Sequence, residues 1–96
     1  MIGVSPGVYD IKFQPSLKQD FRFEFLTDGD TSLEIFIDGY FAPYAKLSTK
    51  HLKGSGYVDV SLSLPEDVDV GGVNGLVIGA RQENNPQEGF VLVGEM

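Results

Sequence analysis

Cysteine is absent from this 96-residue chain, and histidine occurs only once. Without cysteine the fold has neither disulfides nor thiolate sites, so packing alone must hold it together. The same shortage excludes zinc sites built from cysteine and histidine. A histidine-based catalytic triad would have to use His51, which lies in the polar loop segment Lys50-His51-Leu52-Lys53. Since no carboxylate lies close in sequence to orient its ring, we expect a solvated loop histidine, no catalytic residues and no enzyme activity.

Positive charge is also scarce. Seven Lys and Arg residues stand against 14 Asp and Glu residues, so the net charge is −7 at pH 7. An acidic chain without a basic cluster repels phosphate groups, which disfavours both nucleic-acid binding and electrostatic attachment to anionic lipid. No apolar run approaches the roughly 18 to 20 residues that are needed to span a bilayer. We therefore expect no nucleic-acid partner and no direct membrane contact.

Helical periodicity is missing, and alternation with a period of two takes its place. Three stretches place every second apolar residue on one side of an extended chain, as expected for strands with one buried face. They include Phe21, Phe23 and Phe25, then Leu33, Ile35 and Ile37, then Val58, Val60, Leu62 and Leu64. Weaker segments raise the number of expected strands to seven: 8–13, 20–26, 32–38, 44–48, 57–64, 75–83 and 89–95.

Short strands separated by regularly spaced glycine and proline are typical of a sandwich or small barrel. Hydrophobic residues make up 42% of the chain, which suffices for one genuine core. The sequence therefore predicts a single all-β domain over residues 1–96. Asp28-Gly29-Asp30 is its strongest hairpin signal, and it predicts that 20–26 and 32–38 pair with each other.

Three of the expected strands carry apolar residues on both faces. In a seven-stranded immunoglobulin-like order, 32–38, 75–83 and 89–95 share one sheet, whose outer face would then expose Phe36, Val77 and Val91. Exposed apolar patches mark partner surfaces. These three residues are the expected contact site, either for a protein partner or for self-association, which unpaired edge strands would also favour. The alternative is that loops cover the patch.

The order of motifs resembles a class of extracytoplasmic immunoglobulin-like modules of archaeal and bacterial cell-surface proteins. The resemblance rests on the opening turn Ser5-Pro6-Gly7, a phenylalanine-rich second strand, the corner from Gly39 to Ser48 and the strand end Leu64-Pro65-Glu66. It implies a seven-stranded, fibronectin type III-like antiparallel β-sandwich and a spacer or contact role at a cell surface or in a secreted protein. It brings no catalytic residues with it. We also expect the chain to be a segment of a longer protein.

Two further kinds of site are open. Tyr40, Phe41 and Tyr44 could stack against a sugar ring, which would make the chain a small carbohydrate-binding module, although a corner of the fold could equally bury them. Carboxylates at 66, 67 and 69, and less so at 28 and 30, could bind calcium, although the full twelve-residue calcium loop is absent. The weak calcium candidates are Glu66, Asp67 and Asp69. We expect no cofactor.

Overall fold

The computed structural model describes residues 2–69, 75–83 and 88–94, and they form two sheets packed face to face. Nine strands are present in these ranges: β1 (Gly3–Ser5), β2 (Val8–Asp10), β3 (Lys18–Leu26), β4 (Ser32–Asp38), β5 (Ala45–Leu47), β6 (His51–Lys53), β7 (Gly56–Ser63), β8 (Leu76–Gln82) and β9 (Glu88–Gly94). One short 3-10 helix, η1 (Ala42–Tyr44), precedes β5. The prediction of an all-β chain is confirmed.

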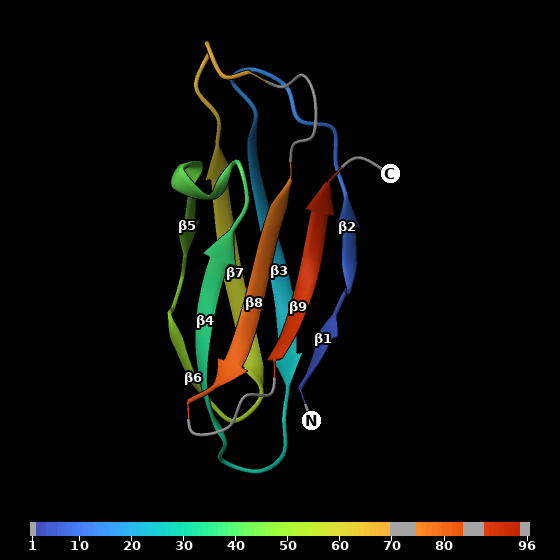
Figure 1. The fold of residues 1–96 in the computed structure, drawn as a ribbon, viewed down its shortest axis with the longest axis vertical. Helices are drawn as coiled ribbons and strands as arrows, with labels where there is room; N and C mark the ends of the chain where they lie inside the picture. Colours follow the sequence, from blue (N-terminus) through green and yellow to red (C-terminus); the bar gives the residue numbers. More distant parts are fainter. Residues whose placement is uncertain (1, 70–74, 84–87, 95–96) are drawn as a thin grey trace.

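The four-stranded sheet has the order β1-β3-β7-β5, and the five-stranded sheet has the order β2-β9-β8-β4-β6. Figure 1 shows β4, β8 and β9 side by side in front of β3 and β7. The expected sharing of one sheet by 32–38 and the last two strands is therefore confirmed. All neighbouring strands pair antiparallel except β2 and β9, which pair parallel, so the expectation of a purely antiparallel fold is wrong at this pair.

The hairpin predicted at Asp28-Gly29-Asp30 is wrong. β3 pairs with β1 and β7, whereas β4 pairs with β6 and β8, so this turn carries the chain from one sheet to the other. Gly29 has φ +56°, the left-handed conformation that glycine adopts at no steric cost. The turn residues specify a chain reversal, but they do not specify which strands pair afterwards.

Two of the nine strands have no counterpart among the seven expected ones, and both belong to runs that change sheets. β1 pairs with β3, and after Pro6 and Gly7 the chain continues as β2 in the other sheet. On the opposite side, β5 pairs with β7 and the chain continues as β6 beside β4. A strand of three residues is too short to show a clear period by itself, so β1 and β6 gave no pattern of their own. β2 and β5 are equally short but lie within the longer predicted segments 8–13 and 44–48.

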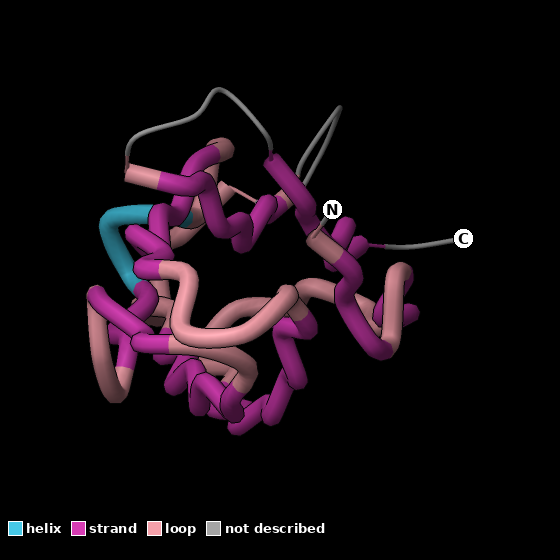
Figure 2. The backbone as a smooth tube through the Cα atoms, turned by 90° about the horizontal axis from the view of Figure 1, so that it is seen from below, coloured by secondary structure: helices cyan, strands magenta, loops and turns pink. Residues whose placement is uncertain are grey.

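The core lies between the sheets and is built from the alternating residues. Its fully buried members include Phe23 and Phe25 from β3, Val58 and Val60 from β7, and Ile78 from β8. The end view in Figure 2 shows strands surrounding this interior, which the side chains fill. No charged or polar residue is buried among the described residues, so the core is held by apolar packing, as the absence of cysteine requires.

Candidate functional site

The outer face of the five-stranded sheet carries apolar side chains on β4 and β8, which are neighbours, and on β2, which lies beyond β9. Val8 on β2 is 46% exposed, and Phe36 on β4 and Val77 on β8 are half-buried. Their neighbours along each strand point the other way: Ile35 and Ile78 are buried in the core. We call Val8, Phe36 and Val77 the apolar face. Two of its three residues, Phe36 and Val77, are residues that the sequence singled out.

Phe36 lies on β4, at the side of this face that is farthest from Val8. It stands directly opposite Gly79 in the register of β4 and β8, and its ring lies over that glycine so closely that a Cβ added there would lie 2.6 Å from Phe36 Cε1. The Arg81 guanidinium lies 4.4 Å from the ring centroid, at cation–π distance. The ring therefore packs against the Gly79 backbone and has the Arg81 cation over it, which limits its freedom.

The register of β9 bears on Val91, the third expected contact residue. Val91 stands opposite Ile78, whose side chain is buried, whereas Phe90 and Leu92 stand opposite Gly79 and Val77. The Val91 side chain itself lies outside the described part of the structure.

Acidic residues flank the apolar face. Glu34 and Asp38 precede and follow Phe36 by two residues on β4, so all three point to the same side of the sheet, and both carboxylates are exposed. Arg81 stands opposite Glu34 in register, and Val77 stands opposite Asp38. An apolar centre with charged neighbours has the general composition of a protein–protein contact patch.

The four-stranded sheet exposes Leu26 and Tyr57, but its outer face also carries polar side chains that pair with one another. Arg22 on β3 donates two hydrogen bonds to the Asp59 carboxylate on β7, at 2.8 Å from Nε and 3.1 Å from Nη2. Its guanidinium also lies 5.4 Å from the ring centroid of Tyr57. On the same face Ser61 donates a hydrogen bond of 2.8 Å to Asp20. These polar side chains hydrogen-bond to one another. The side chains of the apolar face contain no hydrogen-bonding groups.

The Arg22–Asp59 pair shifts the pKa of both groups. The hydrogen bond from Arg22, followed by its positive charge, lowers the pKa of Asp59 below its ordinary value of 3.8 although partial desolvation opposes the change. The hydrogen bond to Asp59 correspondingly raises the pKa of Arg22. Both side chains are largely exposed, so solvent and salt screen this pair.

The three aromatic residues proposed for sugar stacking do not form one platform. Phe41 is fully buried, with its ring centroid 4.4 Å from that of Phe13 in the core. Tyr40 is 54% exposed and packs edge-on against Phe41 at 5.1 Å, while Tyr44 in η1 is 37% exposed. The corner after Gly39 turns Phe41 inward, and the Phe41 backbone N–H donates a hydrogen bond to Gly75 O at 3.4 Å. Of the three aromatic residues, only the two tyrosines can therefore contact a ligand.

The remaining sequence candidates do not assemble into a site. Glu66, Asp67 and Asp69 are exposed, and among the residues that the structure describes no group of three or more acidic or histidine side chains is arranged to hold a metal ion. His51 Nδ1 lies 3.1 Å from Glu83 Oε1, a carboxylate 32 positions away that local sequence could not reveal. Both side chains are exposed, and the pair lies at the surface.

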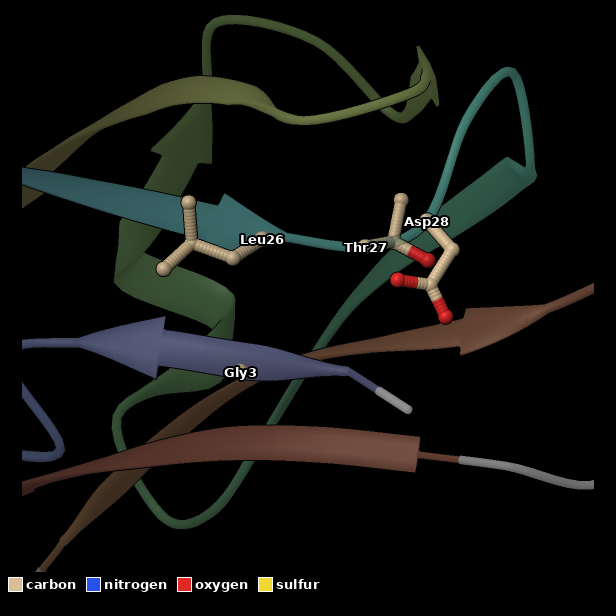
Figure 3. A pocket seen from close by; sticks show the side chains of 4 residues that line it. All are labelled: Gly3, Leu26, Thr27 and Asp28. Atoms are coloured by element: carbon tan, nitrogen blue, oxygen red, sulfur yellow. The ribbon is translucent and has the colours of Figure 1, made fainter.

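A shallow hollow of about 270 Å³ lies at the end of the sandwich where β3 stops. Figure 3 shows Leu26, Thr27 and Asp28 following one another beside Gly3 of β1. Thr27 Oγ1 is inaccessible to solvent and has no hydrogen-bond partner, although the Thr27 backbone N–H donates to Ser55 Oγ at 2.9 Å and the Thr27 carbonyl accepts from it at 3.1 Å. The hollow is open and lined by few polar groups, so it does not resemble a small-molecule site.

Comparison with known protein families, with curated proteins and with solved structures finds no match to this chain. Within residues 2–69, 75–83 and 88–94, no helix is long and apolar enough to cross a membrane. The residues themselves must therefore carry the argument for function.

Proposed function

We propose that this chain is a non-enzymatic interaction module of a cell-surface or secreted protein, and that it binds a protein partner through the apolar face. The proposal includes an immunoglobulin-like, fibronectin type III-like identity for the sandwich. The observation that carries it is that Phe36 and Val77 stand on neighbouring strands, on the outer side of the five-stranded sheet, and are only half-buried.

The charge distribution favours a basic partner over a second copy. Glu34 and Asp38 flank Phe36, and the chain carries a net charge of −7. Among the described residues, Arg81 is the one cation that the structure shows over Phe36, and two copies brought face to face would still bring together two chains of net charge −7. A partner with an aromatic or aliphatic centre and Lys or Arg at its rim complements both parts of the surface. Steering between opposite charges would also speed the encounter at low ionic strength.

The first test is the mass of the purified chain in solution, measured by multi-angle light scattering over a wide concentration range. A monomer at every concentration agrees with a foreign partner. If the wild type is a dimer and Phe36→Glu is a monomer, the apolar face is still the contact surface, but the partner is a second copy of the chain and not a basic protein. A dimer unaffected by Phe36→Glu would contradict both versions.

The second test selects binders from a random phage-displayed peptide library against the intact chain. We expect selected peptides to be basic with apolar residues, and Phe36→Glu to weaken them at least tenfold, about 1.4 kcal/mol, since buried aromatic anchors dominate such contacts. Tyr57→Glu is the matched control, because Tyr57 is an exposed aromatic residue on the other sheet. Peptides that lose binding with Tyr57→Glu and not with Phe36→Glu would refute the proposed surface.

The alternative is a small carbohydrate-binding module. The observation in its favour is that Tyr40 and Tyr44 both expose their rings, at 54% and 37%. Glycan-array binding by the wild type that is lost in the double variant Tyr40→Ala/Tyr44→Ala, and kept in Phe36→Glu, would select this function. Glycan binding that is unchanged in both variants would exclude this role for the two tyrosines.

A further inference from the structure

An aspartate and a glycine adjoin each other where β4 ends. Asp38 is the last residue of this strand, and both Asp38 and Gly39 are exposed to solvent. The Gly39 backbone N–H donates a hydrogen bond of 2.8 Å to Asp38 Oδ1, so the carboxyl group lies against the peptide bond that follows it. We infer that Asp38 is a modification site, at which Gly39 N attacks the side-chain carboxyl and converts the aspartate to isoaspartate without an enzyme.

The reaction needs no oxidant, reductant or cofactor. Gly39 N forms a bond to Asp38 Cγ, and the carboxyl hydroxyl leaves with the amide proton as water, which closes a five-membered succinimide ring. Water then opens the ring at one of its two carbonyls. Attack at the side-chain carbonyl restores aspartate, whereas attack at the main-chain carbonyl leaves Gly39 N bonded to Cγ, which is isoaspartate. The product contains the same atoms as the starting chain.

The attacking nitrogen and the carboxyl group are already neighbours. The hydrogen bond keeps Gly39 N beside the Asp38 carboxyl, and a rotation about the Cβ–Cγ bond turns the face of Cγ toward this nitrogen. This terminal torsion of aspartate has a broad range, and the side chain is exposed, so the rotation is open to it. Holding two reacting groups in such proximity removes much of the entropic cost of their encounter.

Glycine at position 39 favours ring closure. A side chain after the aspartate would crowd the attacking nitrogen, and glycine has none. Gly39 has φ +106°, and it lies beyond the last paired position of β4, where Asp38 stands opposite Val77. Figure 1 shows the chain leaving β4 at this point and turning through η1 toward β5. The ladder between β4 and β8 therefore does not hold the Gly39 nitrogen.

The modification would change the surroundings of the apolar face. Asp38 flanks Phe36 on β4 and stands opposite Val77. Isoaspartate lengthens the main chain by one methylene group between this pair and the corner, and it moves the carboxylate to a new position on the backbone. Isoaspartate formation requires no partner, so a test of it is independent of the proposed binding function.

A second Asp-Gly pair, Asp28-Gly29, gives an internal comparison. Its peptide bond is held in a turn, because the Asp28 carbonyl accepts hydrogen bonds from Thr31 N–H at 3.4 Å and from Thr31 Oγ1 at 2.7 Å. Ring closure must reorient this peptide bond. We therefore expect folding to slow isoaspartate formation less at Asp38 than at Asp28.

Peptide mapping of the intact chain, after prolonged incubation in mildly acidic buffer, tests the inference. One tryptic peptide, residues 23–46, contains both Asp-Gly pairs, and electron-transfer fragmentation distinguishes isoaspartate from aspartate at each. The same incubation in guanidinium chloride gives the rates of the unfolded chain. We expect the folded chain to convert Asp38 at a rate within about tenfold of the unfolded chain, since misplacement by about 1 Å costs roughly a hundredfold. A slower folded rate at Asp38, or greater slowing by folding at Asp38 than at Asp28, would overturn the inference.

Two variants test the ring closure itself, with circular dichroism to check that both are folded. Asp38→Asn keeps the oxygen that accepts from Gly39, and in neutral buffer its amide should leave as ammonia faster than the wild type loses water. Asp38→Glu keeps the charge but needs a six-membered ring, so position 38 should stay unmodified over the same time. A folded Asp38→Asn chain that retains its amide, or an Asp38→Glu chain that is modified as fast as the wild type, would overturn the inference.

Discussion

Gly79 lies beneath the ring of Phe36, and the pair stands directly opposed in the register of β4 and β8. A side chain at position 79 and a flat-lying ring at position 36 therefore exclude each other. Glycine has no side chain to shield its own backbone, and the Phe36 ring covers the backbone at position 79 instead. Gly79 is therefore buried although it faces the outer side of the sheet.

The first prediction concerns this pair. Gly79→Ala should destabilise the fold by about 1–3 kcal/mol, because the ring must leave its position to admit the new methyl group. Urea or guanidinium unfolding measures the loss. Gly7→Ala is the control, since a Cβ there meets nothing within 4 Å. Equal changes at the two positions would show that the Phe36 ring does not occupy the space above Gly79.

The second prediction compares two neighbouring aromatic residues at the corner. Phe41→Ala should cost about 3–5 kcal/mol, because its ring is fully buried against Phe13. Tyr40→Ala should cost about 0.5–1.5 kcal/mol, the worth of one aromatic pair, since its ring is mostly exposed. Chemical denaturation of the two variants measures both values. A Tyr40→Ala loss as large as that of Phe41→Ala would contradict the inward turn of Phe41 alone.

The third prediction is a pH dependence. The folded pKa of Asp59 lies below its ordinary value of 3.8, so the stabilisation from the Arg22 pair is fully present above that value. It is lost as the pH falls through the lowered pKa. NMR titration of the Asp59 carboxyl should give a midpoint below 3.8 in the wild type and closer to 3.8 in Arg22→Gln. High salt should reduce the difference.

A fold-level check accompanies this titration. The stability difference between the wild type and Asp59→Asn should be constant near neutral pH and should shrink in acid, where both chains carry an uncharged group at position 59. If the stability difference between the wild type and Asp59→Asn grew as the pH fell, the result would contradict a lowered pKa for Asp59 in the folded state.

The fourth prediction compares a glycine that has both a positive φ and a close backbone neighbour with a glycine that has a positive φ alone. Gly39 has φ +106°, and a Cβ added there would lie 2.6 Å from Gly75 O. Gly29 has φ +56°, and the space around it is open. Gly39→Ala should therefore lose more stability than Gly29→Ala, which carries only the backbone strain of about 1–2 kcal/mol. Thermal or chemical unfolding compares the two, and equal losses would mean that the chain relaxes away from Gly75.

The alternation of apolar residues was sufficient to locate the main strands. The expected strand 32–38 coincides with β4, and the alternating side chains of β3 and β7 are buried as predicted. Period two is a local property of the chain, so local sequence reveals it. Strand pairing is not local: the turn at Asp28-Gly29-Asp30 resembles a hairpin, yet contacts far along the chain assign β3 and β4 to different sheets.

The candidate site was predictable to a similar extent. Phe36 was recognisable because an aromatic residue stood on a polar side of a strand, but the partnership of Phe36 with Gly79 and Arg81 depends on register. Val91 was predicted on the outer face, and its side chain lies outside the described residues. The last strand is apolar on both sides, and a slip of one residue would reverse its faces, so local sequence constrains this prediction weakly. At the corner, no periodicity distinguished the buried Phe41 from the exposed Tyr40.

The two runs that change sheets, β1 to β2 and β5 to β6, have a consequence for misassembly. A long, flat edge strand is a template onto which another chain can add, and such strand addition leads to aggregation and cross-β fibres. In the described part of this chain, the outermost strands of both sheets are three-residue pieces, each too short to recruit a partner strand along its length. None of these outermost strands therefore offers a long edge along which another chain could pair.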